Sequence, residues 1–304
     1  MPHWPRTIAM LNQKGGVGKT TSTANLGAAL ADSGCRVLLI DLDPQGHLTL
    51  HLGLAPGPDD PTAYDLLLDP QCQARDTIMK ARDRLDAIFS EVDLAIAESE
   101  LPAVQDRQRI LQRKTESIRD QYDVIIIDCP PSLGQLTLNA LAMADEVIVP
   151  MQAHFLALQG VGRLLETVEL ITQSVNAQLR VTGILLCMYE SQTTLAREVV
   201  TDINEYFEAV RDQAVPWNQC HVLQPPIRRN IKLAEAPSFG QTIFDYAPQC
   251  NGARDYRAVA DQLLKAWGGP PPQIPVTDSD GVTTQSGQHL KMGAATTLDT
   301  GADA

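Results

Sequence analysis

The chain has 304 residues with a formal net charge of −13, of which 44% are hydrophobic, 5% aromatic and 20% charged. This length accommodates one large α/β domain or two small ones, and an acidic chain repels nucleic acid unless it has a local basic patch. Because it has no run of 18 apolar residues and no secretion signal pattern, we expect a cytoplasmic protein that does not span a membrane.

Apolar runs and helical patterns alternate along the chain. The runs that predict strands are Ile8–Leu11, Val37–Ile40, Val124–Ile127, Val147–Val149 and Val181–Met188. The helical patterns lie at 21–31, 102–120, 135–143, 157–174, 194–210 and 254–266, and a loop is expected at 53–61. Strands that are apolar throughout are typical of a parallel sheet buried on both faces. We therefore expect an α/β fold with one doubly wound, mostly parallel sheet that has helices on both faces.

The first predicted strand leads into a glycine-rich loop, Lys14–Thr20, which a helical pattern follows. This is the context of a P-loop, in which backbone N–H groups at a helix N-terminus converge on phosphate. Lys19 is placed to reach the β- and γ-phosphates, and the Thr20 hydroxyl to hold Mg²⁺. The usual pattern has glycine where this chain has Gln13, and Lys14 follows as an extra cation. Since such a loop has little room for a second lysine, we expect Lys14 to reach a neighbouring subunit's site.

Two carboxylates, Asp41 and Asp43, come at the end of the second predicted strand. Two residues apart, they are expected to point to the same side, toward the crevice at which α/β sheets bind ligands. One of them is suited to bind Mg²⁺ through water and the other to orient the attacking water. The alternative interpretation is an aspartate that caps the next turn.

A third element, Ile125–Ser132, has a run of apolar residues that ends in Asp128, as in a Walker B motif with its aspartate near Mg²⁺. Pro130 and Pro131 stiffen the following loop, and Gly134 gives it a pivot. We expect this loop to sense the γ-phosphate and to move on hydrolysis.

With these motifs, three further segments make the chain similar to the ParA family of partition ATPases, within the MinD/ParA deviant Walker class. The segments are Leu136–Leu141, Ala157–Gly160 and Arg228–Gly240. The resemblance extends from about residue 6 to residue 267. It implies an ATPase that uses ATP and Mg²⁺, is slow without its partner, and forms an ATP-sandwiched homodimer in which Lys14 crosses to the partner's nucleotide. It also implies DNA binding without sequence preference, nucleoid association, and a ParB-like or other cargo adaptor protein, so that a chromosome, plasmid or other cargo is positioned.

The resemblance also implies the site residues. Those expected at the cofactor are Lys14, Gly15, Gly16, Val17, Gly18, Lys19, Thr20 and Thr21, with Pro226, Arg228 and Asn230 on the adenine side. Those expected near the metal are Thr20, Asp41 and Asp128, and the catalytic set is Lys14, Lys19 and Asp43. In this family the carboxylate that matches Asp43 is tied to hydrolysis rather than to nucleotide binding.

Basic residues on an otherwise acidic chain indicate where DNA would bind. The expected DNA-binding residues are Arg228, Arg229, Lys232 and Arg197. Arg197 is included because many relatives have an arginine where this chain has Gln192. His154 and Gln159 also depart from positions that are commonly acidic in the family. The alternative is that these cations are ordinary solvated or salt-bridged side chains.

The remaining features bear on neighbouring classes of protein. We expect an ATPase domain at 1–267 and a disordered tail at 268–304. The alternative is a MinD-like membrane-associated positioning ATPase, which needs a C-terminal amphipathic helix that this tail does not offer. The six cysteines never form a C-x-x-C pair, which argues against a metal-cluster carrier. His47 and His51 lack a third ligand, so a metal there is not expected. The stretch 212–220 resembles an insertion, with Trp217 as a loop anchor.

Overall fold

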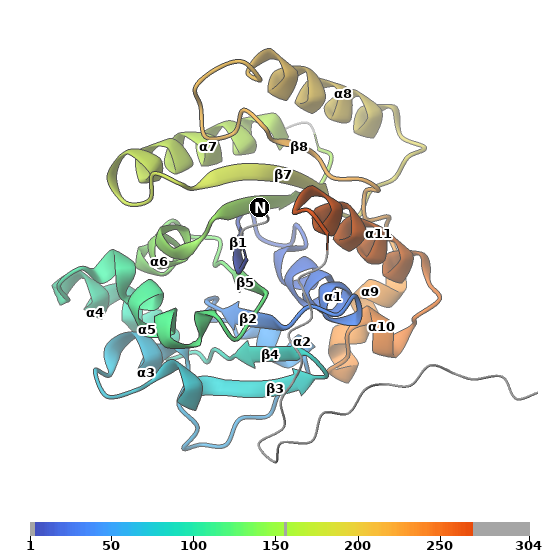
Figure 1. Cartoon of the computed structure of the whole chain (residues 1–304). Helices are drawn as coiled ribbons and strands as arrows, with labels where there is room; N and C mark the ends of the chain where they lie inside the picture. The colour runs from blue at the N-terminus through green and yellow to red at the C-terminus, as the bar shows by residue number, and fades with distance from the viewer. Residues whose placement is uncertain (1–3, 155–156, 270–304) are drawn as a thin grey trace, which may run out of the picture. The chain divides into compact units, whose positions relative to one another are not determined.

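A mostly parallel sheet lies at the centre of the computed structural model, which describes residues 4–154 and 157–269 (Figure 1). Its strands are β1 (Arg6–Met10), β2 (Val37–Asp41), β3 (Ile78–Arg82), β4 (Leu85–Ile88), β5 (Val124–Asp128), β6 (Glu146–Met151), β7 (Arg180–Leu186) and β8 (His221–Val222). Their order is β3-β4-β2-β5-β1-β6-β7-β8, and every neighbouring pair is parallel except β3 and β4. The predicted fold class is confirmed.

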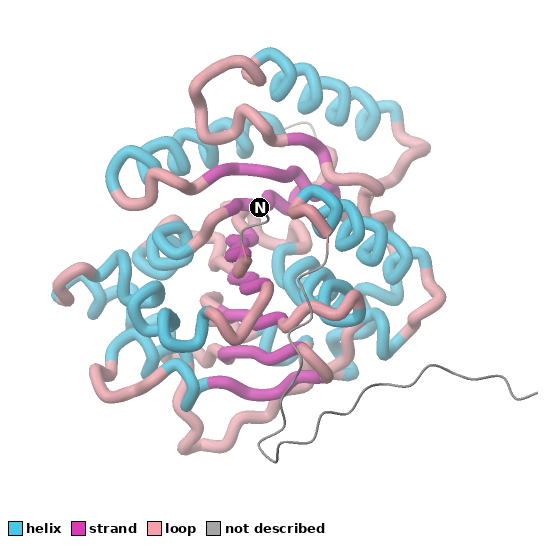
Figure 2. Tube along the Cα trace, viewed as in Figure 1, coloured by secondary structure: helices cyan, strands magenta, loops and turns pink. Residues whose placement is uncertain are grey.

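Helices lie on both faces of the sheet (Figure 2). The α-helices are α1 (Lys19–Asp32), α2 (His47–His51), α3 (Ala63–Leu68), α4 (Leu94–Glu100), α5 (Ile110–Arg119), α6 (Gln135–Met143), α7 (Ala157–Ser174), α8 (Thr194–Ala209), α9 (Ile231–Glu235), α10 (Ile243–Tyr246) and α11 (Asn251–Ala266). Short 3₁₀ turns are η1 (Ala74–Thr77), η2 (Leu101–Ala103), η3 (Arg107–Arg109) and η4 (Ala236–Phe239). Among the described residues, no helix combines the length and the apolar composition that crossing a membrane requires.

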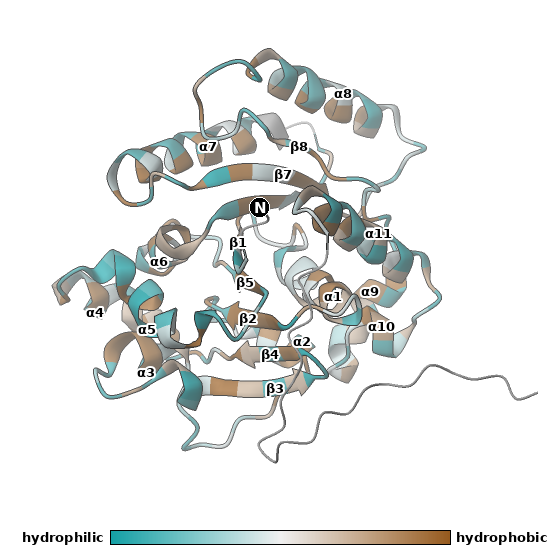
Figure 3. Ribbon diagram, in the orientation of Figure 1, coloured by the Kyte–Doolittle hydropathy of each residue, from teal (hydrophilic) through white to brown (hydrophobic). Residues whose placement is uncertain are grey.

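Two hydrophobic cores cover the two faces of the sheet, because successive strand residues point to opposite sides. Ile8 and Met10 of β1 pack in one core, with residues of α1, α2, α10 and α11. Ala9 packs in the other core, with residues of α3 to α8. The strands are accordingly mostly hydrophobic, with hydrophilic residues in β3 and β7, whereas the helices combine hydrophobic and hydrophilic residues (Figure 3).

Some predicted elements differ from the structure. The helical pattern at 102–120 is wrong in its first half: α5 begins only at Ile110, since Pro102 lies in a 3₁₀ turn and Asp106 has a left-handed backbone with φ of 52°. The strand predicted to reach Met188 ends at Leu186. The loop predicted at 53–61 is confirmed, and Trp217 is buried in the core as a loop anchor.

The strand register brings the predicted motifs to one edge. Met10 at the end of β1 and Asp41 at the end of β2 both lie opposite Asp128 at the end of β5. The loop that follows β1 and the two aspartates therefore meet at the carboxyl edge of the sheet. The predicted tail at 268–304 lies outside the described residues from position 270 onward.

Candidate nucleotide-binding site

The glycine-rich loop after β1 forms an open cradle. Gly16 and Gly18 have left-handed backbones, with φ of 69° and 98°, which glycine adopts without strain. Gly18 is the N-cap of α1 and no side chain caps the helix, so its first N–H groups remain available to a ligand. A Cβ at Gly15 or Gly16 would meet no atom within 4 Å. The loop has the geometry of an anion site.

A cavity of about 880 Å³ opens beside this loop. Its lining residues include Gly15, Gly16, Gly18, Lys19, Thr20, Thr21, Asp43, Pro44, Gln45, His47, Leu50, His51, Ala95, Pro130, Pro131, Ser132, Met188, Pro237 and Ser238. The structure therefore brings together three loops, as their motifs predict: the phosphate loop (Lys14–Thr20), the Asp43 loop between β2 and α2 (42–46), and the loop after β5 (129–134).

Two lysines of the loop lack anionic partners among the described residues. Lys19 is only 7% exposed, and its Nζ donates to the Lys14 carbonyl oxygen at 3.3 Å. Lys14 is exposed, and its backbone N–H donates to Asn12 Oδ1 at 3.0 Å. Neither ammonium group takes part in an ion pair within residues 4–154 and 157–269. A buried, uncompensated ammonium beside open N–H groups favours a phosphate ligand.

Two buried carboxylates, Asp41 and Asp128, lie at the same edge. Burial raises the pKa of both above the ordinary aspartate value, and the charge of Asp128 raises the pKa of Asp41 further. The nearby Thr20 side chain and Lys19 ammonium act in the opposite direction on the pKa of Asp128. A cation at this position would favour the ionised carboxylates.

The two aspartates differ in the capacity that they have left for a metal. Asp128 Oδ1 accepts from the Thr23 hydroxyl at 3.2 Å, whereas its buried Oδ2 has no hydrogen-bond partner among the described residues. Asp41 Oδ1 accepts from the Asp43 N–H, and its Oδ2 accepts from Thr49 N–H and hydroxyl groups, each at 3.1 Å. The unpartnered Asp128 oxygen beside Thr20 fits Mg²⁺ better than Asp41 does.

Asp43 lies at the cavity and Asp41 does not line it. We expected Asp41 and Asp43 to point to the same side, toward the crevice, and this holds only for Asp43. Strand β2 ends at Asp41, so the alternation of side chains along a strand does not extend to Asp43. Asp43 Oδ1 accepts from the Gln45 N–H at 3.0 Å, and its carbonyl accepts from the Ser90 hydroxyl at 2.9 Å. These bonds hold the half-buried carboxylate of Asp43 beside the phosphate loop.

A second cavity, of about 460 Å³, adjoins the phosphate loop at Gly18 and Thr21. Arg228 and Asn230 line it, as expected for the adenine side, but Pro226 is not among its lining residues. Asn230 caps α9, since its Oδ1 accepts from the Lys232 N–H at 3.0 Å. Apolar side chains and Tyr256 complete a wall that suits a flat base.

The predicted basic patch is largely paired with acidic residues. Arg228 forms a bidentate pair with the buried Asp255: its Nε donates to Oδ2 at 3.0 Å and its Nη2 donates to Oδ1 at 2.5 Å. The exposed Arg229 pairs with Glu190 at 2.7 Å and Lys232 with Glu235 at 2.8 Å. The salt-bridged alternative therefore describes these three cations in this structure. Arg197 is exposed and has no ion pair within the described part of the chain.

Within the described part of the chain, His51 has a buried ring nitrogen without a hydrogen-bond partner, which its sequence context does not predict. It is 2% exposed, lines the large cavity, and has no hydrogen-bond partner for its Nε2 among the described residues. Burial lowers the pKa of His51 to about 4, so the ring is neutral at pH 7. Among the described residues, no three histidine, cysteine, aspartate or glutamate side chains cluster as metal ligands.

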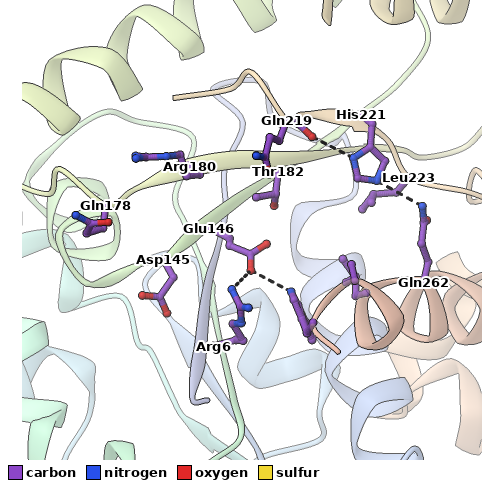
Figure 4. A pocket seen from close by; sticks show the side chains of 13 residues that line it. Arg6, Asp145, Glu146, Gln178, Arg180, Thr182, Gln219, His221, Leu223 and Gln262 are labelled. Atoms are coloured by element: carbon purple, nitrogen blue, oxygen red, sulfur yellow. Dashed lines mark hydrogen bonds and ion pairs between the residues drawn. The ribbon is translucent and has the colours of Figure 1, made fainter. Parts of the chain in front are cut away.

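The opposite edge of the sheet has a cavity of about 490 Å³ that no motif predicts (Figure 4). There Arg6 NH1 donates to Glu146 Oε1 at 3.1 Å, and Trp267 Nε1 donates to the same oxygen at 3.0 Å. Figure 4 shows Arg6 and Glu146 pointing toward one another. The main acidic group of this cavity is thus neutralised within the fold.

Comparisons with known proteins agree with the geometry. An AAA domain family model matches residues 5–181. The chain is 42% identical to the sporulation initiation inhibitor protein Soj of Bacillus subtilis over 85% of this chain and 98% of that protein. It is 38% identical to the chromosome partitioning protein ParA of Caulobacter vibrioides, over 85% and 94%.

Solved structures show the same fold. A Mycobacterium smegmatis protein, described as a cobyrinic acid a,c-diamide synthase with bound ATP analogue and magnesium, is 39% identical with a TM-score of 0.73, over 86% of this chain and 95% of that one. The cell division ATPase MinD of Pyrococcus furiosus is 27% identical with a TM-score of 0.66, over 86% and 99%.

Proposed function

The chain belongs to the Soj/ParA family of chromosome-partitioning ATPases, and we propose that it is an ATP-dependent dimerising switch that positions a cargo on DNA. It is an ATPase whose cofactors are ATP and Mg²⁺, and the bound ATP analogue and magnesium of the M. smegmatis protein support this. The finer steps, which are dimerisation, nonspecific DNA binding, nucleoid association in the cytoplasm, and release by a ParB-like or other cargo adaptor, are part of the proposal.

The observation that carries the proposal is the pair of uncompensated lysines in one loop. Lys19 is buried and its Nζ donates to the Lys14 carbonyl, while the Lys14 side chain is exposed and Lys14 is not among the described residues that line the cavity. Lys19 is suited to bind phosphate from within its own loop. An exposed second lysine is suited to stabilise the nucleotide of a second copy, as a finger supplied in trans.

The residues of the site divide the chemistry among them. The N–H groups of the α1 N-terminus and the Lys19 ammonium bind and orient the phosphates. Thr20 and the unpartnered Asp128 oxygen are the residues that would hold Mg²⁺, which when bound neutralises phosphate charge. Asp43, held by Gln45 and Ser90 at the cavity, is positioned to orient the attacking water.

DNA binding in this proposal uses Arg229, Lys232 and Arg197 rather than Arg228, whose guanidinium is committed to Asp255. The Arg229 and Lys232 pairs are exposed, and exposed pairs contribute only about 0–1 kcal/mol each. Replacing these carboxylate partners by DNA phosphates therefore costs little free energy, and the release of counterions from DNA favours the exchange.

Sedimentation of variants tests the proposal. Asp43→Ala is expected to bind ATP without hydrolysing it and to sediment as a dimer with Mg²⁺ and ATP. Adding Lys14→Ala should return it to a monomer, whereas Lys80→Ala, which removes an exposed lysine on the edge strand β3, should not. A monomeric Asp43→Ala protein that has bound ATP, or one that hydrolyses at the parent rate, contradicts the proposal.

The same dimer distinguishes DNA from a membrane as its surface. Its affinity for nonspecific DNA should fall steeply between roughly 50 and 200 mM salt, and Arg229→Glu should lower both affinity and salt dependence. Arg211→Glu, which reverses an exposed charge paired with Glu208, is the matched control. ATP-dependent flotation with liposomes and no DNA binding would favour the MinD-like alternative.

A further inference from the structure

Helix α4 joins the two loops that border the nucleotide cavity. It spans Leu94–Glu100, and its Ala95 lines the cavity. Just before it, Ser90 donates its hydroxyl to the Asp43 carbonyl at 2.9 Å, and the Ser90 N–H donates to Thr49 Oγ1 at 3.1 Å. The segment that leads into α4 is thus bonded to the Asp43 loop.

At its other end, α4 supplies the cap of a different helix. Glu98 Oε2 accepts from the Gln135 N–H at 2.6 Å, and its Oε1 accepts from the Leu136 N–H at 3.3 Å. These are the first N–H groups of α6, whose own N-cap residue, Gly134, has no side chain to bond them. A carboxylate at a helix N-terminus is favoured by charge as well as by hydrogen bonding.

The approach of Glu98 depends on the glycine at position 134. A Cβ there would overlap the Glu98 carboxylate, so any other residue would push the two apart. Gly134 ends the loop after β5, of which Pro130, Pro131 and Ser132 line the cavity. The Thr137 hydroxyl of α6 donates to the Ser132 carbonyl at 2.6 Å. The cap therefore fixes the helix to which this loop is bonded.

We propose that Glu98 is a positioning residue for ATP hydrolysis: through its cap on α6 it holds the Pro130–Gly134 loop in register with the Asp43 loop. Glu98 does not line the nucleotide cavity, so it acts through the loop and not on the substrate. This inference rests on the proposed function, in which Asp43 orients water and the loop after β5 faces the γ-phosphate.

Four proteins test this role: the parent, Glu98→Ala, Glu98→Gln and the matched control Glu100→Gln. Glu100 is an exposed carboxylate of the same helix, bonded to the Tyr64 hydroxyl and not to α6. For Glu98→Ala we expect kcat to fall about fivefold and KM for ATP to change less than twofold. A fivefold change in rate corresponds to about 1 kcal/mol, the free energy that the loss of one helix cap typically costs. Glu98→Gln, which keeps one acceptor oxygen, should show a smaller loss of kcat, and Glu100→Gln none.

Hydrogen exchange separates positioning from a merely structural role. In the parent and in Glu100→Gln, the peptide that covers residues 129–136 should gain protection when ATP and Mg²⁺ are added, and Glu98→Ala should lose that gain. A folded Glu98→Ala protein with the parent kcat and the parent gain in protection overturns the inference. If Glu98→Ala does not fold, Glu98→Gln decides by the same two readouts.

The outcome is distinguishable from failure of the proposed function. Hydrolysis by Asp43→Ala at the parent rate would refute the role of Asp43 on which both proposals rest. An inactive Asp43→Ala protein beside a fully active Glu98→Ala protein would refute the positioning role alone.

Discussion

The two edges of the sheet differ in whether their charged side chains have partners of opposite charge. At the amino ends of the strands, Arg36 makes a bidentate pair with Asp123 before β2 and β5, with a closest distance of 2.7 Å. Arg6 of β1 pairs with Glu146 of β6 at 3.1 Å. Each of these charged groups has its counter-charge within the fold, which is typical of a structural role.

At the carboxyl ends, Arg228 is also paired with a carboxylate, but two charged groups at the phosphate loop lack such partners within the described part of the chain. Lys19 is buried with only a backbone carbonyl to bond, and one oxygen of the buried Asp128 accepts no hydrogen bond among the described residues. Buried polar groups are normally satisfied, so these two groups favour a ligand. Among the described residues, the amino edge also has unpartnered buried nitrogens, Arg6 Nε and Arg119 Nε, but each of these guanidinium groups pairs with a carboxylate. The same fold therefore separates its stability and its chemistry between opposite edges of one sheet.

The largest expected effect lies at the carboxyl edge. Lys19→Ala removes a buried ammonium aimed at the phosphates, so ATP affinity should fall at least about a hundredfold, equivalent to about 3 kcal/mol. Titration with a fluorescent ATP analogue measures it. Arg6→Ala, at the opposite edge, is the control and should bind ATP as the parent does. Equal losses for both variants would break the contrast between the edges.

The converse effect is expected at the amino edge. Glu146→Ala leaves Arg6 and Trp267 Nε1 without their shared acceptor, and because Arg6 is partly exposed, the free energy of unfolding should fall by about 2 kcal/mol. Urea unfolding measures this loss. ATP affinity should stay at the parent value when measured well below the unfolding midpoint. A selective loss of ATP affinity would mean that the amino edge also serves the nucleotide.

Motifs with local physical causes could be predicted from the sequence. The phosphate loop needs glycines at positions with positive φ, and the buried parallel strands need continuous apolar runs, so both are legible in the chain. Helix α6 has the predicted bounds, 135–143. The edge strand β3 was missed because it is only half buried and contains Lys80 and Arg82, which weaken its apolar pattern. Strand β4 was missed because it is only 4 residues long and contains Asp86.

Partners that lie far apart in sequence could not be predicted. Arg228 looks like a free cation in the sequence, and only the fold places Asp255 of α11 against it. Likewise, Glu98 is one of two acidic residues on the short helix α4, and only the fold brings it to the N-terminus of α6. The sequence therefore predicts which groups can bind phosphate, while the fold determines which charges remain free to do so.

A smaller effect is expected at His51, whose neutral ring has a nitrogen without a hydrogen-bond partner among the described residues at the carboxyl edge. It bears on the contrast between the two edges through the pH dependence of stability. The folded-state pKa of His51, about 4, lies below the ordinary value of 6.5, so between these values the unfolded chain binds a proton that the folded protein does not. The stability that this provides is complete above about pH 6.5 and is lost as the pH falls toward 4. Relative to His51→Gln, the parent should lose about 2 kcal/mol more unfolding free energy between about pH 7.5 and 5.

The exposed His47 of the same helix provides the control substitution, His47→Gln. Urea unfolding at the two pH values gives the comparison directly. If His51→Gln and the parent lose the same stability on acidification, the ring must be able to take up a proton in the folded state. His51 would then have an acceptor for its Nε2 N–H. Lys19 and Asp128 would then be the groups at the carboxyl edge that support the contrast with the amino edge.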